Sequence, residues 1–231
     1  MPRATALLLL ALVLVGRPAL AADGRRTDER YDFIVGELER GEGNAALWCN
    51  GWALGFALAT AGQGAVALAA GDRGWRIDNA VGAASSGLGL IGTLIEPRTP
   101  ITAAAELRAM DSSTPRARAL RLRRAEQLLR SAAQEEVDGR SWFPHVAGAA
   151  TTLAASAVLW YGYDRYASGW LNLVGGTLVC ELQIASRPTA AARSYRAYFD
   201  RYASGRAAAA LAPQRLWVRP QGLGLGLGGE W

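Results

Sequence analysis

Four polar residues that interrupt apolar stretches are the strongest candidates for chemistry in this chain. His145, the only histidine, could exchange a proton with Glu181, and Asn50 could form a second polar pair with Glu96. Ionisable groups inside or at the edge of a membrane span are by default candidates for a proton relay, an ion site or a lipid headgroup contact. The alternative is that both glutamates lie at the membrane boundary and have only a structural role.

Four long stretches almost free of charged side chains carry these residues. We expect helices at about 45–70, 79–96, 143–163 and 167–186. A helix needs about 20 mainly apolar residues to cross a bilayer, and short polar turns join the stretches in two antiparallel pairs. The predicted fold class is an all-α membrane protein with four transmembrane helices. A soluble all-α fold is the alternative, because the mean hydropathy of +0.07 is modest.

The two hairpins look like copies of one unit. The first ends at Arg98-Thr-Pro-Ile-Thr-Ala-Ala-Ala and the second at Arg187-Pro-Thr-Ala-Ala-Ala. Folding each hairpin about its turn places Glu181 about one helical turn from His145. The same operation places Glu96 about one turn from Asn50. The duplication therefore predicts a polar pair at the same depth in each unit.

The first residues are typical of a secretory signal peptide. Arg3 precedes an apolar run from Ala4 to Val15, and Ala19-Leu20-Ala21 provides a small-residue cleavage pattern. We expect residues 1–21 to be removed. The remaining chain then divides into a first repeat at 22–112, a second repeat at 113–205 and a Gly-rich, strand-like tail at 206–231.

Amphipathic helices flank the hairpins in this prediction. Thr114-Pro115 predicts the start of a basic helix over about 115–137, and further amphipathic helices are expected at 28–40 and 189–203. A lipid-headgroup contact is predicted for five arginines near the start of the basic helix: Arg116, Arg118, Arg121, Arg123 and Arg124. A solvated helix face is the alternative.

Charge and cysteine content bound the partners. All 25 basic residues are arginine, and loss of residues 1–21 leaves 23 of them against 20 acids. This small excess argues against nucleic acid as a partner. We expect membrane lipids and either a second copy or another envelope protein instead. Cys49 and Cys180, one in each repeat, would form a disulfide if the hairpins bring them close in an oxidising compartment, and two separate buried thiols are the alternative.

The tail and the arginine distribution bear on location. Leu223, Leu225, Leu227 and Trp231 fall at odd positions, which predicts a short C-terminal β-hairpin. The pattern is similar to the C-terminal signal of outer-membrane proteins, so the outer membrane is the alternative to the favoured inner membrane of a bacterial cell envelope. With an exported N-terminus, four spans place 20 of the 23 arginines on the exported side, which is opposite to the positive-inside rule.

Several of these motifs resemble those of one group of membrane proteins. Trp48-Cys-Asn-Gly-Trp52, His145, the segment 176–181, Ile184 and Pro188 resemble an uncharacterised family of signal-peptide-bearing polytopic helical membrane proteins of Gram-negative bacteria. The resemblance covers about residues 28–190. It implies a polytopic membrane protein and carries over no catalytic residue.

The motifs that would identify a common enzyme class are missing. The sequence has no G-x-S-x-G, Walker loop, H-E-x-x-H or paired C-x-x-C, and one histidine is a poor basis for a metal site. We therefore expect no metal, no cofactor and no enzymatic activity, but a structural or interaction module of the envelope. The alternatives are a small transporter or ion pathway through His145, Glu181 and Glu96, and a lipid-modifying enzyme with His145 as base.

Overall fold

The computed structural model describes the backbone of residues 3–202, 216–221 and 224–229 and the side chains of residues 24–202. The chain divides into two compact units, Met1–Tyr195 and Arg196–Trp231. The first unit contains α1 (Arg3–Ala69), α2 (Arg73–Ile95), α3 (Thr99–Arg108), α4 (Pro115–Asp138), α5 (Trp142–Ala157), the π-helical η1 (Val158–Gly162) and α6 (Tyr166–Ala185). Helix α7 (Ala190–Tyr202) continues from the first unit into the second. In the second unit β1 (Leu216–Gln221) pairs antiparallel with β2 (Gly224–Gly229), which is where the sequence predicts a β-hairpin.

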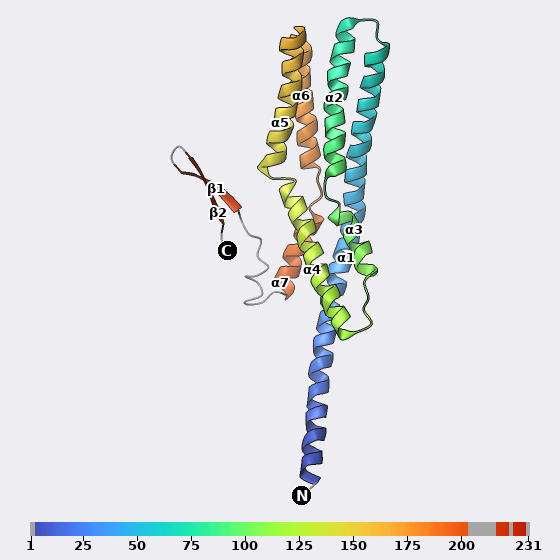
Figure 1. The fold of residues 1–231 in the computed structure, drawn as a ribbon, viewed down its shortest axis with the longest axis vertical. Coiled ribbons are helices and arrows are strands. Elements are labelled where there is room, and N and C mark those ends of the chain that lie inside the picture. The colour runs from blue at the N-terminus through green and yellow to red at the C-terminus, as the bar shows by residue number, and fades with distance from the viewer. Residues whose placement is uncertain (1–2, 203–215, 222–223, 230–231) are drawn as a thin grey trace. The chain divides into compact units, whose positions relative to one another are not determined.

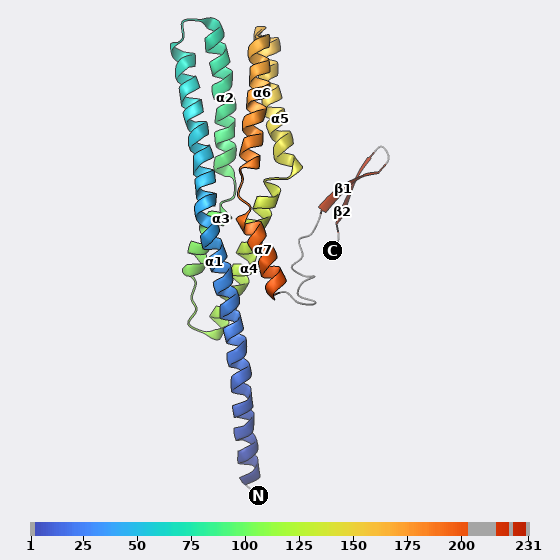
Figure 2. The ribbon, with the colours of Figure 1, turned by 180° about the vertical axis from the view of Figure 1, so that it is seen from behind.

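The first unit is all-α, as predicted, and contains both expected hairpins. The second half of α1 packs along α2, and α5 with η1 packs along α6 (Figures 1 and 2). We call residues 45–69 of α1, together with α2, α5, η1 and α6, the hairpin segments. Their bounds agree with the predicted helices within two residues, with two exceptions: no helix begins near residue 45, because α1 is continuous from Arg3, and α2 begins six residues earlier than expected. It does so because the Asp72 side chain accepts a hydrogen bond from the Trp75 backbone N–H at 2.8 Å and caps the helix.

The amphipathic elements gather at one end of the hairpins. Helices α3 and α4, residues 24–44 of α1 and the start of α7 form what we call the charged layer (Figure 1). Its core is apolar, with Ile34, Leu107 and Leu129 fully buried. Arginine–glutamate pairs connect its helices: Arg30–Glu126, Arg108–Glu39 and Arg124–Glu106. The predicted start of α4 is confirmed, since the Thr114 hydroxyl accepts a hydrogen bond from the Ala117 N–H at 3.1 Å.

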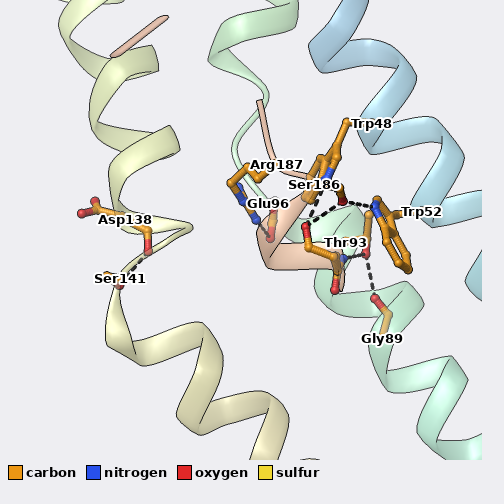
Figure 3. A network of polar contacts seen from close by, with 10 residues as sticks. Trp48, Trp52, Gly89, Thr93, Glu96, Asp138, Ser141, Ser186 and Arg187 are labelled. Atoms are coloured by element: carbon orange, nitrogen blue, oxygen red, sulfur yellow. Dashed lines mark hydrogen bonds and ion pairs between the residues drawn. The ribbon is translucent and has the colours of Figure 1, made fainter. Parts of the chain in front are cut away.

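The two repeats join their amphipathic and hairpin helices differently. In the first repeat α1 is one continuous helix, so the expected helix at 28–40 has no separate end. In the second repeat the chain breaks between α4 and α5, where the Ser141 hydroxyl bonds the Asp138 carbonyl at 2.6 Å (Figure 3). Helix α3 was not expected from the sequence. It begins at the Arg98 signature, as α7 begins just after the Arg187 signature, so both repeats place an amphipathic helix there.

One part of the described chain is long and apolar enough to cross a membrane by length and composition alone. It covers Gly24–Ala69 of α1, close to the N-terminus. Such a stretch is compatible with a signal sequence or a single span. Helix α5 has only 16 residues before the π-helical turn begins. By length and composition the described chain thus has one candidate span, and the four spans stay a prediction.

The glycines of the hairpin segments differ in how closely a neighbouring helix approaches them. A Cβ atom at Gly148 would lie 2.9 Å from the Cys180 Cβ, and Thr152 meets Gly176, so α5 and α6 do approach closely there. Gly51 and Gly55 have nothing within 4 Å of their Cβ positions. No side chain or backbone of the described residues therefore packs closely against α1 at these two glycines.

Candidate functional site

The structure brings His145 and Glu181 together. The His145 Nδ1 lies 2.9 Å from both carboxylate oxygens of Glu181, across the α5–α6 hairpin. Both side chains are about half exposed. A carboxylate on Nδ1 fixes the orientation of the ring and leaves Nε2 able to accept a proton. The pair can therefore relay a proton or act as a base.

Asn50, the expected partner of Glu96, does not pair with it. Asn50 is exposed on α1, whereas Glu96 accepts a hydrogen bond from Arg187 at 2.6 Å. Arg187 follows α6, so this ion pair connects the first hairpin to the second. Of the two predicted polar pairs, the structure forms His145–Glu181, and Glu96 pairs with Arg187 in place of Asn50.

Arg187 is the centre of a network at the end of α6. Its guanidinium lies 4.4 Å from the Trp48 ring centroid, in cation–π contact. The neighbouring Ser186 hydroxyl accepts hydrogen bonds from the indole N–H groups of Trp48 and Trp52, both at 3.1 Å (Figure 3). The Arg187 side chain is only 13% exposed. The network therefore attaches α1, α2 and α6 to one another where the hairpins meet the charged layer.

A second ion pair connects the hairpins at their other end. Asp78 of α2 accepts hydrogen bonds from Arg165 and, at 2.8 Å, from Ser168. Arg165 immediately precedes α6. Helix α2 thus carries an acid near each end, and arginines at the two ends of α6 pair with them.

Uncharged polar side chains continue between these two ion pairs. The Gln183 amide donates to Thr93 at 3.0 Å, from the second hairpin to the first. Asn172 donates to Ser156 at 3.0 Å within the second hairpin, and Gln63 donates to Ser86 at 3.2 Å within the first. The facing sides of the hairpins therefore hold a row of amides and hydroxyls.

A cavity of about 490 Å³ lies between the hairpins. The row of amides and hydroxyls lines it, together with apolar residues such as Phe56, Phe143 and Val179 and several glycines. Glu96 and Arg187 are the only charged residues in its wall. This volume falls in the range of about 300–1,000 Å³ that is usual for small-molecule sites.

Two adjacent glutamates of α4 cap the two signature helices. Glu135 accepts hydrogen bonds from the Thr99 backbone N–H at 3.2 Å and from its hydroxyl, at the start of α3. Glu136, which is buried, accepts from the Ala192 N–H at 2.9 Å at the start of α7. Carboxylates stabilise helix N-termini. At each of the two Arg-Thr/Pro signatures, a glutamate of α4 therefore caps the helix that begins there: Glu135 caps α3 and Glu136 caps α7.

Substitution of Glu135 by glutamine tests the cost of burying its charge. Burial raises the pKa of the Glu135 carboxyl, and the hydrogen bonds from Thr99 only partly oppose this. A carboxyl group whose pKa is higher in the folded state than in the unfolded state contributes most to stability when it is protonated. This contribution is lost as the pH rises through the folded-state pKa. We expect Glu135→Gln to melt no lower than the parent at pH 7, with the difference closing below about pH 4. Thermal melts from pH 4 to 7 measure this, and a variant that is less stable at pH 7 would mean that the Thr99 bonds outweigh the burial.

The predicted lipid-contact arginines have different environments. Arg116 and Arg123 are exposed. Arg124 pairs with Glu106 at 2.6 Å, and the Arg121 guanidinium lies 3.7 Å from the Tyr31 ring centroid. Arg118 is half-buried. Arg121 and Arg124 are therefore engaged in contacts within the charged layer. The lipid-headgroup contact stays a prediction for Arg116, Arg118 and Arg123.

The remaining site predictions concern cysteines and metals. Cys49 is a buried free thiol on α1, and Cys180 is a half-buried free thiol on α6, so the alternative of separate thiols describes the structure. Within residues 24–202, no group of three or more His, Cys, Asp or Glu side chains is placed to hold a metal ion.

Sequence reasoning missed Arg187, Asp78, Arg165 and Glu135 as site residues. The signal for Arg187 was present, because it opens a repeated signature. The signal for Asp78 and Arg165 was weaker, since both were assigned to polar turns. Comparison of the chain with protein-family models, curated proteins and solved structures finds no match.

Proposed function

We propose that this chain is an integral membrane protein of the bacterial envelope, in which the two hairpins lie side by side in the bilayer and the charged layer lies at the membrane surface. Its function on this proposal is that of a structural or interaction module, without enzymatic activity. The observation that carries the proposal is the reversed distribution of polarity in the hairpin segments. Their exposed residues include many large apolar side chains: Leu54, Leu58, Leu68, Ile91, Ile95, Leu171, Leu178 and Leu182. Their buried residues include Thr93, Thr152 and Ser156.

This reversal distinguishes the hairpins from the charged layer. In the charged layer most buried side chains are apolar, as in a water-soluble bundle, with Glu136 and Ser194 as the exceptions. Large exposed apolar surfaces are rare on soluble monomers and mark membrane or protein contacts. Interfaces between helices in lipid are instead rich in small and hydrogen-bonding residues. One chain therefore has one part suited to lipid and one part suited to water.

Aromatic side chains at both ends of the hairpins support the same placement. Trp and Tyr are enriched at the two membrane–water boundaries. Exposed aromatic residues occur near the hairpin turns at Trp75, Tyr161, Tyr163, Tyr166 and Trp170, and at the opposite end at Trp142 and Phe143. The 23 residues of α2 and the 20 of α6 extend about 34 and 30 Å as α-helices. These lengths match a hydrocarbon core of about 30 Å.

Alkaline carbonate extraction tests the proposal directly. We expect the chain to stay in the membrane pellet at high pH and to be released only by detergent. In a variant without Cys49 and Cys180, Gly71→Cys and Tyr163→Cys should react alike with a membrane-impermeant maleimide, since both lie at the hairpin turns. Ser112→Cys, between α3 and α4, should report the opposite side of the membrane. Release by carbonate, or labelling of all three positions from one side, would contradict four spans.

The alternative of an ion or proton pathway is supported only by the His145–Glu181 contact. Glu96, which this pathway also requires, bonds Arg187 instead. Neither His145 nor Glu181 is among the residues that line the cavity between the hairpins. The interaction module is therefore the better supported of the two functions.

A further inference from the structure

We propose that the cavity between the hairpins binds a neutral membrane lipid whose polar end carries a hydroxyl group, the class to which diacylglycerols belong. This inference rests on the proposed membrane location, since only a membrane component would then surround the cavity. It adds a ligand that the interaction module alone does not require.

The first argument is the space itself. All four helices of the hairpins contribute to the wall of the 490 Å³ cavity. Gly92 of α2 leaves part of this space open, because nothing lies within 4 Å of its Cβ position. An apolar chain entering from the bilayer would lie against Leu88, Phe143 and Val179, which also form the wall.

The second argument is charge. Glu96 and Arg187, the only charged residues in the wall, are bonded to each other at 2.6 Å. A charged ligand in this position would find no counter-charge that is not already paired, and an unpaired charge in a low-dielectric site is costly. The occupant that fits best is therefore neutral.

The third argument is hydrogen bonding. The amide nitrogens of Asn172 and Gln183 donate to protein partners, but their amide oxygens accept no hydrogen bond from any residue the structure describes. Neither oxygen is fully buried, and both residues line the cavity. Two open acceptors call for a ligand that donates. A hydroxyl group on an otherwise apolar molecule meets this requirement.

Native mass spectrometry of the purified full chain in detergent, titrated with dioleoylglycerol, tests the inference. We expect saturable binding of one lipid per chain. The acetylated analogue, which lacks the hydroxyl donor, should bind at least tenfold more weakly, and anionic dioleoylphosphatidylglycerol should not compete. Equal binding of the acetylated analogue, stronger binding of the anionic lipid, or no binding of dioleoylglycerol would overturn the proposal.

A matched pair of glycine variants locates the site. Gly92→Leu adds a side chain in the cavity wall at a position where a Cβ atom meets nothing within 4 Å, and it should weaken dioleoylglycerol binding at least tenfold. Gly175→Leu adds the same side chain where nothing lies within 4 Å and outside the cavity wall, so it should change binding less than twofold. Equal binding by both variants would contradict this site. If the chain resists carbonate extraction but binds no dioleoylglycerol, the lipid site is wrong and the membrane placement stands, whereas extraction by carbonate contradicts the membrane placement itself.

Discussion

Replacement of Arg187 by methionine is expected to destabilise the fold by about 2–3 kcal/mol, which is less than the ~3–5 kcal/mol for a fully buried ion pair, because the Glu96 side chain is 31% exposed. The Arg187 side chain is 13% exposed and bonds Glu96 at 2.6 Å. Methionine retains much of the apolar contact with Trp48 but leaves Glu96 without its partner. It also removes a positive charge that lowers the pKa of Glu135, which burial already raises. The substitution therefore removes a neighbouring positive charge from two carboxylates, Glu96 and Glu135.

Tryptophan fluorescence during thermal unfolding in detergent measures this loss. For a chain of this size we expect the melting temperature to fall by roughly 4–12 °C. Arg98→Met is the matched control, because Arg98 opens the same signature in the first repeat but is exposed and has no ion pair in the described structure. It should change stability by no more than about 0.5 kcal/mol. Arg187→Lys, which keeps the charge but loses the planar fork, should lie between the two, and equal effects of Arg187→Met and Arg98→Met would contradict the role assigned to Arg187.

The helices of this chain could largely be predicted because their signals are local. Long uncharged runs gave the hairpin helices, and Thr114-Pro115 gave the start of α4 to the residue. Helix α3 was missed even though its signature was recognised. Its start depends on Glu135, which lies 36 residues away along the chain. A cap supplied by a distant helix leaves no mark in the local sequence.

The same difference between local and distant contacts explains the site. The contact between His145 and Glu181 lies within one hairpin, so folding the chain about its own turn was enough to pair them. Folding the first hairpin about its turn predicted Asn50 as the partner of Glu96. This prediction failed because Arg187 from the other hairpin binds the Glu96 carboxylate. An ion pair is stronger than a contact with an exposed amide such as Asn50. Pairing between the hairpins could not be derived from either one alone.

The charges at the helix ends are complementary between the two hairpins. Two copies of one unit with identical charges would repel at equivalent positions. Here the second helix of the first hairpin carries acids, Asp78 and Glu96, and the second helix of the other hairpin is bounded by Arg165 and Arg187. The two copies have thus become complementary at both ends. The uncharged row between the ends leaves room for the cavity.

Charge reversal at the turn end is expected to show this complementarity as a coupling. Asp78→Arg and Arg165→Asp should each lower the melting temperature by several degrees, because each places like charges together in a contact between helices. The double variant restores opposite charges across the same gap, and the Ser168 hydroxyl can then accept rather than donate. It should regain most of the summed loss, so that the double-mutant cycle gives a favourable coupling larger than either single effect. Thermal melts of the four proteins in one detergent provide the measurement.

Glu106→Arg, at the exposed pair with Arg124, is the control and should cost no more than about 1 kcal/mol. Purely additive effects at Asp78 and Arg165 would mean that this ion pair does not hold the hairpins together. A strong coupling would mean that the turn end contributes to their association independently of Arg187. Loss of the Asp78–Arg165 pair should then loosen the hairpins at their turns, because Arg187 still holds the opposite end at the charged layer.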